Sequence, residues 1–314
     1  DFQEADEDSH GTHAAGIIAA QHNGKGIRGV ASNIRIMPLK FLRGNDGGFT
    51  FDAVEGILYA EKMGASIVNC SWGSYGYSSI LESVMAESDM LFVCAAGNDF
   101  ASTDEITHYP SGYDLPNVIS VAALSTNGFL CDFSNFGSGV DIAAPGRNIY
   151  STLPKNRYGA MDGTSMAAPF VSGIAALVKS NVPTLSAKMI RQKILAGHRE
   201  LANGKQLPKI SANAYGALSI SLDTPQPNIP RYGASAAETS EGIVLIGGYD
   251  GEGQYVAQIE KYDETTNKWL NPFPITSLAR AFQGSVSVAG RAYLMGGYGN
   301  NGISKEVYSF NGSS

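Results

Sequence analysis

The sequence predicts an α/β fold, with a doubly wound parallel β-sheet covered by helices on both faces, followed by a separate all-β segment. Two observations predict this arrangement. Short apolar runs alternate with helical patterns over residues 1–222, and such alternation is typical of parallel sheets. Beyond Leu218 a proline-rich stretch is followed by an internal repeat of strand-forming segments. A chain of 314 residues also exceeds what one hydrophobic core usually organises, so two domains are expected.

Four short apolar runs are expected to form strands of the sheet, at residues 34–39, 67–70, 90–94 and 118–121. Between the first two runs, Asp52 is expected to cap a helix that ends at Gly64. This helix would carry Val54, Ile57 and Leu58 on one face. In such sheets ligands bind beyond the carboxyl ends of the strands. Ser71 and Asn98 each follow a predicted strand, so we expect the functional site there.

Three further helices are predicted. One covers residues 80–87, and an amphipathic one covers residues 186–195. Residues 167–178 are apolar on nearly all sides, which predicts a buried central helix with Pro169 in its first turn. Ser165 would then lie just before this helix, where the helix dipole and the free amides favour negative charge.

Composition excludes several classes of function. The net charge of −7 argues against a nucleic acid or an anionic membrane as the main partner, and no apolar run is long enough to span a bilayer. Cys70, Cys94 and Cys131 make an odd count without the close spacing of a disulfide framework. We expect Cys70 and Cys94 to be small apolar residues in buried strands. Cysteine usage leaves the redox compartment open.

Three motifs carry residues suited to acyl transfer. Ser165 lies in the run Gly-Thr-Ser-Met-Ala-Ala-Pro, and His10 begins the run His-Gly-Thr-His. Asn98 ends an apolar strand in the run Ala-Ala-Gly-Asn. A serine hydroxyl is a poor nucleophile until a base takes its proton, and a carboxamide can donate to the oxyanion that forms. A nucleophile, a base and an oxyanion donor together predict a serine peptidase.

In this order the three motifs resemble the subtilisin-like serine proteases (subtilases, peptidase S8), and the resemblance covers residues 1–222. It implies that His10 is the general base, Asn98 the oxyanion donor and Ser165 the nucleophile. The family order is Asp, His, Ser, and the family's aspartate follows an apolar strand some thirty residues before the histidine. Asp1, Asp6 and Asp8 are too close to His10 and follow no strand. We therefore expect the catalytic aspartate and its strand to lie outside this chain.

The resemblance also implies residues that bind the substrate. Ser71-Trp72-Gly73 matches a segment that pairs with the substrate backbone by strand addition, although an ordinary exit from a strand would look similar. Asp99 takes a position that lines the pocket for the residue before the cut. A carboxylate there would favour a basic side chain, and the alternative is a solvated loop aspartate.

A calcium loop is implied as well, although calcium is not required for the chemistry. Residues 21–27 resemble the family's loop, in which the Asn23 side chain and the carbonyls of Gln21, Lys25 and Ile27 would be ligands. Calcium takes six to eight oxygen ligands, so the others would come from outside the chain. The alternative is a plain glycine-rich turn.

The end of the chain resembles kelch repeats. After a linker at 223–230 that contains three prolines, residues 231–248 match residues 280–297 at an offset of 49 (280 − 231). Each copy ends in an apolar strand and a glycine pair, and the period fits one blade of a propeller. A propeller needs at least four blades, so residues 231–314 are expected to be an incomplete propeller segment.

Two functions follow from these features. The first is a serine endopeptidase, secreted or at the cell surface, that hydrolyses a protein or peptide substrate through an acyl-enzyme. Its kelch module would bind an unknown ligand. The second is a catalytically silent pseudoprotease whose kelch propeller is the working binding module. The presence of His10, Asn98 and Ser165 together favours the endopeptidase. The missing aspartate does not discriminate between the two functions, because its whole strand is missing too.

Overall fold

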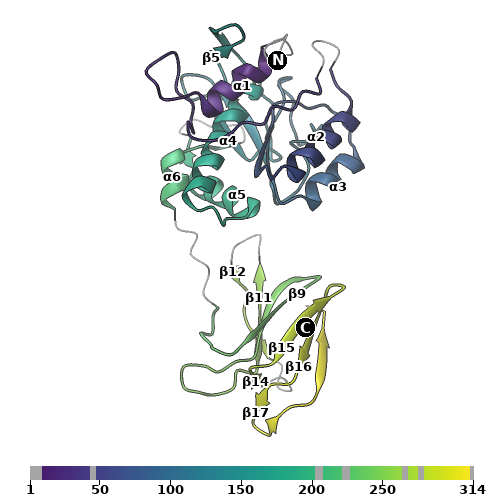
Figure 1. The fold of residues 1–314 in the computed structure, drawn as a ribbon. Helices are drawn as coiled ribbons and strands as arrows, with labels where there is room; N and C mark the ends of the chain where they lie inside the picture. The colour runs from purple at the N-terminus through teal and green to yellow at the C-terminus, as the bar shows by residue number, and fades with distance from the viewer. Residues whose placement is uncertain are drawn as a thin grey trace. The chain divides into compact units, whose positions relative to one another are not determined.

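The first 222 residues contain one six-stranded sheet packed with helices (Figure 1). The structure, a computed structural model, describes residues 9–42, 47–201, 208–220, 227–263, 268–274 and 279–311. It divides into two units, Asp1–Leu222 and Asp223–Ser314. In sheet order, the strands of the first unit are β1 (Ile67–Cys70), β2 (Leu91–Ala95), β3 (Val118–Leu124), β4 (Ile142–Pro145), β8 (Ile210–Ser211) and β7 (Arg199–Glu200). All neighbours pair in parallel except β7, which is antiparallel to β8.

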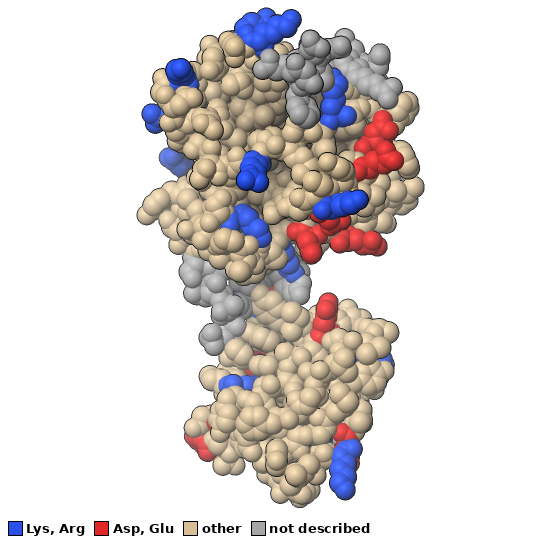
Figure 2. All heavy atoms as spheres, in the orientation of Figure 1, with Lys and Arg blue, Asp and Glu red and all other residues tan. Residues whose placement is uncertain are grey.

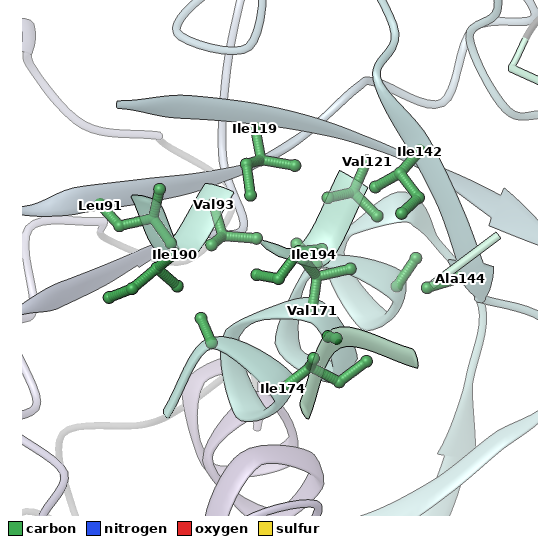
Figure 3. Close-up of a cluster of buried hydrophobic side chains, with 14 of the residues drawn as sticks. Leu91, Val93, Ile119, Val121, Ile142, Ala144, Val171, Ile174, Ile190 and Ile194 are labelled. Atoms are coloured by element: carbon green, nitrogen blue, oxygen red, sulfur yellow. The ribbon is translucent and has the colours of Figure 1, made fainter. Parts of the chain in front are cut away.

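Helices cover both faces of this sheet, as the alternation of elements predicts. The helices of the first unit are α1 (His10–Ala19), α2 (Thr50–Lys62), α3 (Ser79–Glu87), α4 (Thr164–Asn181), α5 (Ala187–Ala196) and α6 (Ala214–Ser219). Side chains alternate across a strand, so neighbouring residues of β2 enter different cores. Val93 packs with Ile174 of α4 and Ile194 of α5 (Figure 3). Phe92 packs on the other face with residues of α2 and α3.

The expected strands at 67–70, 90–94 and 118–121 are confirmed within one to three residues at their ends. The expected helices at 80–87 and 186–195 are confirmed as α3 and α5. Ser78 and Ser186 cap these two helices, each accepting a hydrogen bond from the amide three residues later. The three cysteines are buried and free, as small apolar residues in a core would be.

The expected strand at 34–39 is wrong. These residues are irregular, and no backbone hydrogen bond is recorded for any of them within the described part of the chain. Ile36, Met37 and Leu39 are about two-fifths exposed. A cavity of about 810 Å³ is lined by this segment and by Ile67, Val68 and Asn69 of β1. The segment has the apolar composition of a strand but lacks a partner for its ladder.

The helix α2 differs from expectation in two details. Phe49 takes the cap position and Asp52 lies in the first turn, where its carboxylate still favours the helix dipole. Leu58 is exposed, because the buried stripe of α2 runs through Val54 and Ile57 on the other side. Gly64 follows the end of the helix with φ of 79°, a conformation that glycine adopts readily.

The second unit repeats one pattern of strands at the predicted offset. The strands β9 (Ser235–Thr239) and β10 (Gly242–Ile246) recur 49 positions later as β15 (Gly284–Val288) and β16 (Arg291–Met295). Likewise β11 (Gln258–Asp263) corresponds to β19 (Val307–Phe310). Shorter strands complete this unit: β12 (Lys268–Trp269), β13 (Phe273–Pro274), β14 (Arg280–Ala281), β17 (Tyr298–Gly299) and β18 (Gly302–Ile303). All these pairings are antiparallel.

Charged side chains of both signs are scattered over the face of the molecule in Figure 2. Among the described residues, no helix is long and apolar enough to cross a membrane.

Truncating a side chain between the sheet and α4 should destabilise the first unit. Ile119 is fully buried in that core, and Ile→Ala changes in cores cost about 2–5 kcal/mol because a cavity remains. We expect Ile119→Ala to lower the free energy of unfolding by about 3 kcal/mol in denaturant titrations. Ile106→Ala, at a half-exposed position of the same unit, is the control and should change it far less. Equal decreases in the free energy of unfolding for Ile119→Ala and Ile106→Ala would contradict the assigned core.

Candidate active site

Ser165 lies in the first turn of α4. The helix begins at Thr164 with Gly163 as its N-cap. This start is three residues earlier than the predicted one at residue 167, so Ser165 lies inside the helix and not just before it. The first amides of a helix have no partner within it. The Gly163 amide is anchored elsewhere, by donating to the Gly146 carbonyl at 2.8 Å. Ser165 itself is half-buried, so its hydroxyl stands at the dipole end of a buried helix.

Pro169 ties the serine to the sheet. It lies in the second turn of α4 rather than the first, so its missing N–H would have bonded to the carbonyl of Ser165. The Ser71 hydroxyl donates to that carbonyl instead, at 2.7 Å. In return the Ser165 hydroxyl donates to the Ser71 carbonyl at 3.1 Å. The two serines therefore hold the start of α4 against the carboxyl end of β1.

A polar chain behind these serines fixes the Ser71 hydroxyl. The Asn69 carboxamide donates to it at 2.8 Å and accepts from the Ser172 hydroxyl of α4 at 2.9 Å. Ser71 and Ser172 are both buried. Buried polar groups are costly unless they are hydrogen-bonded, so this chain favours a single arrangement of the helix on the strand.

The side chain of Asn98 is oriented by Thr164. Its carboxamide oxygen accepts from the Thr164 amide at 2.8 Å and from the Thr164 hydroxyl at 3.0 Å. The same hydroxyl accepts from the Gly97 amide at 3.2 Å. Because both donors engage the oxygen, the NH₂ group of Asn98 is left to face away from Thr164.

Two N–H donors border the space beside Gly163. A methyl group placed on Gly163 would lie 3.5 Å from the Ser165 amide nitrogen and 3.7 Å from Asn98 Nδ2. Gly163 has φ of 148°, which L side chains rarely adopt. The same point is 3.6 Å from the sulfur of Met166. The glycine therefore leaves the space next to Ser165 free of a side chain, and the two nitrogens beside it are suited to stabilise an oxyanion.

His10 is the first residue of α1 and is half-buried. This helix packs against α4, which carries Ser165. Its other side rests on β5 (Ile149–Leu153), which forms a hairpin with β6 (Arg157–Met161). Hydroxyls of β5 donate to the carbonyls of Thr12 and His13 at 2.8 and 2.7 Å. The sequence patterns did not predict this hairpin, although it anchors the helix that carries His10.

His13 has the surroundings of a structural residue. It is fully buried, and its Nε2 bonds to the carbonyls of Ile149 and Gly159 at 2.9 and 3.2 Å. Its Nδ1 is buried without a partner. Burial lowers the pKa of His13 below its usual 6.5, against the opposing effect of the two carbonyls.

The residues expected to bind substrate lie on two neighbouring loops. Ser71 is buried, Trp72 stacks edge-on against Phe41 with ring centres 5.0 Å apart, and Gly73 is exposed. Asp99 is exposed, and its carboxylate accepts from the Tyr75 hydroxyl at 2.7 Å. The hydroxyl of Tyr75 thus links the loop after Ser71 to the loop that carries Asp99. The sequence patterns did not single out this tyrosine.

The expected calcium loop has the contacts of a self-contained turn. The Asn23 side-chain oxygen accepts from the Lys25 amide at 3.0 Å, and the Gln21 carbonyl accepts from the Asn23 amide at 3.0 Å. Both are oxygens expected to bind the metal. Residues 21–27 contain no carboxylate, and the described residues hold no cluster of acidic or histidine side chains suited to a metal. The four expected ligand oxygens, from Gln21, Asn23, Lys25 and Ile27, are fewer than the six to eight that calcium takes, so the site would need further ligands and stays a prediction.

Comparison with known proteins gives the same two relationships as the sequence motifs. The model of the subtilase family matches residues 2–217, and the kelch motif matches residues 230–271. Subtilisin DY from Bacillus licheniformis is 37% identical over 217 residues, which cover 67% of this chain and 78% of that protein. A thermophilic serine proteinase from Bacillus sp. (strain AK1) is 42% identical over 184 residues, covering 57% of this chain and 45% of that protein.

A solved structure has the fold of the first unit. A protease from Pseudoalteromonas arctica PAMC 21717 matches with a TM-score of 0.61 and 31% sequence identity. The match covers 67% of this chain and 70% of that chain. The predicted subtilisin-like α/β fold, followed by an incomplete kelch segment, is therefore confirmed.

Stability should fall as the pH is lowered, in part because of His13. Its pKa is lower in the folded protein than in the unfolded chain, so the unfolded chain binds the proton more tightly. Its contribution is present above pH 6.5 and lost as the pH falls below that value. We expect the thermal midpoint to drop between pH 7 and pH 5, and less steeply in His13→Asn.

Buried His108 also has a lowered pKa, so the slope should shrink in His13→Asn without vanishing. Replacing exposed His22 with asparagine is the control. A pH slope that is the same in His13→Asn as in the unsubstituted protein would contradict a buried neutral His13.

Proposed function

The chain belongs to the subtilase family, and we propose that it is a serine endopeptidase that cleaves peptide bonds through an acyl-enzyme on Ser165. One observation carries this proposal: the Ser165 amide nitrogen and Asn98 Nδ2 both lie within 4 Å of the position that a methyl group on Gly163 would take. Donors that are fixed before the reaction stabilise the charge of a tetrahedral intermediate without reorganisation. If Ser165 only stabilised the start of the helix, the carboxamide of Asn98 would not be needed beside it.

In the proposed reaction, Ser165 Oγ attacks the scissile carbonyl while His10 takes the hydroxyl proton. The carbonyl oxygen becomes negative and is held by the Ser165 amide and the Asn98 NH₂ group. His10 then protonates the leaving amine, and water hydrolyses the acyl-enzyme by the same steps. Catalysis by this route requires Oγ to leave the Ser71 carbonyl, its acceptor in this structure, and turn toward His10.

The aspartate that would orient His10 is proposed to come from outside the 314 residues. Asp1, Asp6 and Asp8 lie outside the described residues. In the described part of the chain β1 pairs with β2 alone, and the unpartnered segment 34–39 lines the same cavity as β1. One apolar strand in that cavity would complete both ladders and end at the carboxyl edge of the sheet, near Ser71. Such a strand would carry the aspartate.

The loops beside Ser165 are proposed to select the substrate. Ser71, Trp72 and Gly73 would pair with the substrate backbone. Asp99 would favour lysine or arginine before the cut, since its carboxylate is exposed at the neighbouring loop. The kelch unit would bind an as yet unknown ligand, and the protein would act outside the cell or at its surface. No calcium step enters this mechanism.

A fluorophosphonate should modify Ser165 and no other residue, because His10 and the oxyanion site are proposed to activate this hydroxyl. We expect mass spectrometry to find one modified peptide, with the modification lost in Ser165→Ala and slowed in His10→Ala. Ser180→Ala, at an exposed position of the same helix, is the control and should be modified as the unsubstituted protein is. Absence of modification would favour a pseudoprotease with the kelch unit as its working module.

Extending the chain with the natural upstream residues should raise both stability and activity. An aspartate that fixes the tautomer of the histidine is worth about 3 × 10⁴ in turnover, a value measured in subtilisin itself. We expect the extended chain to hydrolyse peptide substrates faster by orders of magnitude, and to unfold at a higher temperature because the cavity beside β1 is filled. Equal activity from the 314 residues alone would show that an aspartate within them already serves His10.

A further inference from the structure

The turn that carries Asn98, residues 97–101, includes a phenylalanine with an unfavourable backbone conformation. Gly97 has φ of 107° and Phe100 has φ of 52°, so both lie in the left-handed region. For a bulky residue such as Phe100 this conformation is unfavourable, and it persists only where the surroundings impose it. The turn also carries Asp99. Something outside residues 97–101 must therefore hold it.

The Asn135 side chain makes four hydrogen bonds at this turn. Its oxygen accepts from the amides of Asp99 and Ala101 at 3.1 and 3.0 Å. Its NH₂ group donates to the Ala96 carbonyl at 2.9 Å and to the Tyr75 hydroxyl at 3.4 Å. A carboxamide has two acceptor sites and two donors, so its full capacity is used. If the Asn135 carboxamide were flipped, its NH₂ group would face the N–H groups of Asp99 and Ala101. The hydrogen-bond partners therefore also fix which way the carboxamide points.

Asn135 packs closely against the turn. The residue is fully buried. A methyl group on Gly97 would lie only 2.2 Å from Asn135 Nδ2. The backbone continues the same clamp, because the Asn135 amide donates to the Gly97 carbonyl at 3.0 Å and the Phe136 amide donates to the Ala101 carbonyl at 3.1 Å. The Asn135 carboxamide bonds the amides of Asp99 and Ala101, and the Asn135 backbone amide bonds the Gly97 carbonyl. Asn135 therefore holds the residues on both sides of Asn98.

We propose that Asn135 is a positioning residue for the oxyanion site: it holds the turn 97–101 so that Asn98 presents its NH₂ group beside Ser165. This inference rests on the proposed function and extends it to a residue remote in sequence. Thr164 fixes the side chain of Asn98 from the helix side, whereas Asn135 fixes the backbone of the turn from the opposite side. The NH₂ group of Asn98 is therefore fixed only when both its side chain and the backbone of its turn are held.

Asn135 also joins the oxyanion site to the loop expected to bind substrate. Tyr75 accepts from Asn135 and donates to Asp99, so one carboxamide contacts both walls of the proposed pocket. Loss of Asn135 should therefore disturb the placement of Asp99 together with that of Asn98. The reaction at Ser165 should be affected more than binding, because the oxyanion donor acts on charge that develops in the reaction.

The test compares Asn135→Ala with Asn117→Ala in the full 314-residue chain. Asn117 is a matched control because it is also buried and its carboxamide also bonds three backbone groups, the carbonyls of Met85, Ser88 and Met90. The readout is the rate constant for modification of Ser165 by a fluorophosphonate. In that step the Oγ–P bond forms, fluoride leaves, the serine proton passes to His10, and the phosphoryl oxygen occupies the oxyanion site.

Both variants should lower the unfolding midpoint, but only Asn135→Ala should slow the modification, by about tenfold or more, since a lost oxyanion donor costs about 10²–10³. In an Asn98→Ala background, Asn135→Ala should cause no further slowing, because it acts through Asn98. Equal slowing in both backgrounds, or an unchanged rate in Asn135→Ala, would overturn the proposal.

Backbone amide exchange separates this inference from the proposed function. Asn135→Ala should speed exchange at Asp99 and Ala101 relative to Asn117→Ala, whether or not Ser165 reacts. If the unsubstituted chain is not modified at Ser165, the proposed peptidase function fails while amide exchange still decides whether the clamp exists. Unchanged exchange at both amides would show that Asn135 does not hold the turn.

Discussion

The start of α4 is the point on which the rest of the site depends. Pro169 removes one helical hydrogen bond, and the hydroxyl of Ser71 takes the carbonyl that this loss exposes. Thr164 meanwhile engages Asn98 through two donors. The helix is thus joined to the ends of two adjacent parallel strands, β1 and β2, by hydrogen bonds from both sides of its first turn. Ser165 lies between them, so the placement of the serine follows from the docking of the helix.

This docking is possible because α4 is buried along nearly its whole length. Its side chains fill the core against β2, β3 and β4, and the apolar contacts supply the free energy that keeps the helix in place (Figure 3). The polar groups at its first turn contribute little net stability, since each exchanges a bond to water for one within the protein. They select one position of the helix among many that the apolar core would tolerate.

The sequence predicted the parts of the molecule whose determinants are local. Short apolar runs identified three strands, and helical patterns of apolar residues identified the helices at 80–87 and 186–195. The one predicted cap, Asp52, was wrong by three residues. The segment 34–39 was wrongly predicted because a strand needs a partner, which no local pattern reports. Contacts across long separations were also missed: Thr164 lies 66 positions from Asn98 and Asn135 lies 36 from Asp99. Such pairings depend on the fold, and only the motif around Ser165 hinted at the first.

The second unit follows a different physical rule from the first. Ala237 and Ile246 are buried between its two repeated sheets, but the equivalent residues of the second repeat, Val286 and Met295, are about 45% exposed. The first repeat therefore buries this face against the second, whereas the same face of the second repeat is exposed in the described residues. Stability in such arrays is a sum of interfaces between neighbours, whereas the first unit encloses its own cores. A change at Ile246 should act on one interface, while a change at Ile119 acts on a whole domain.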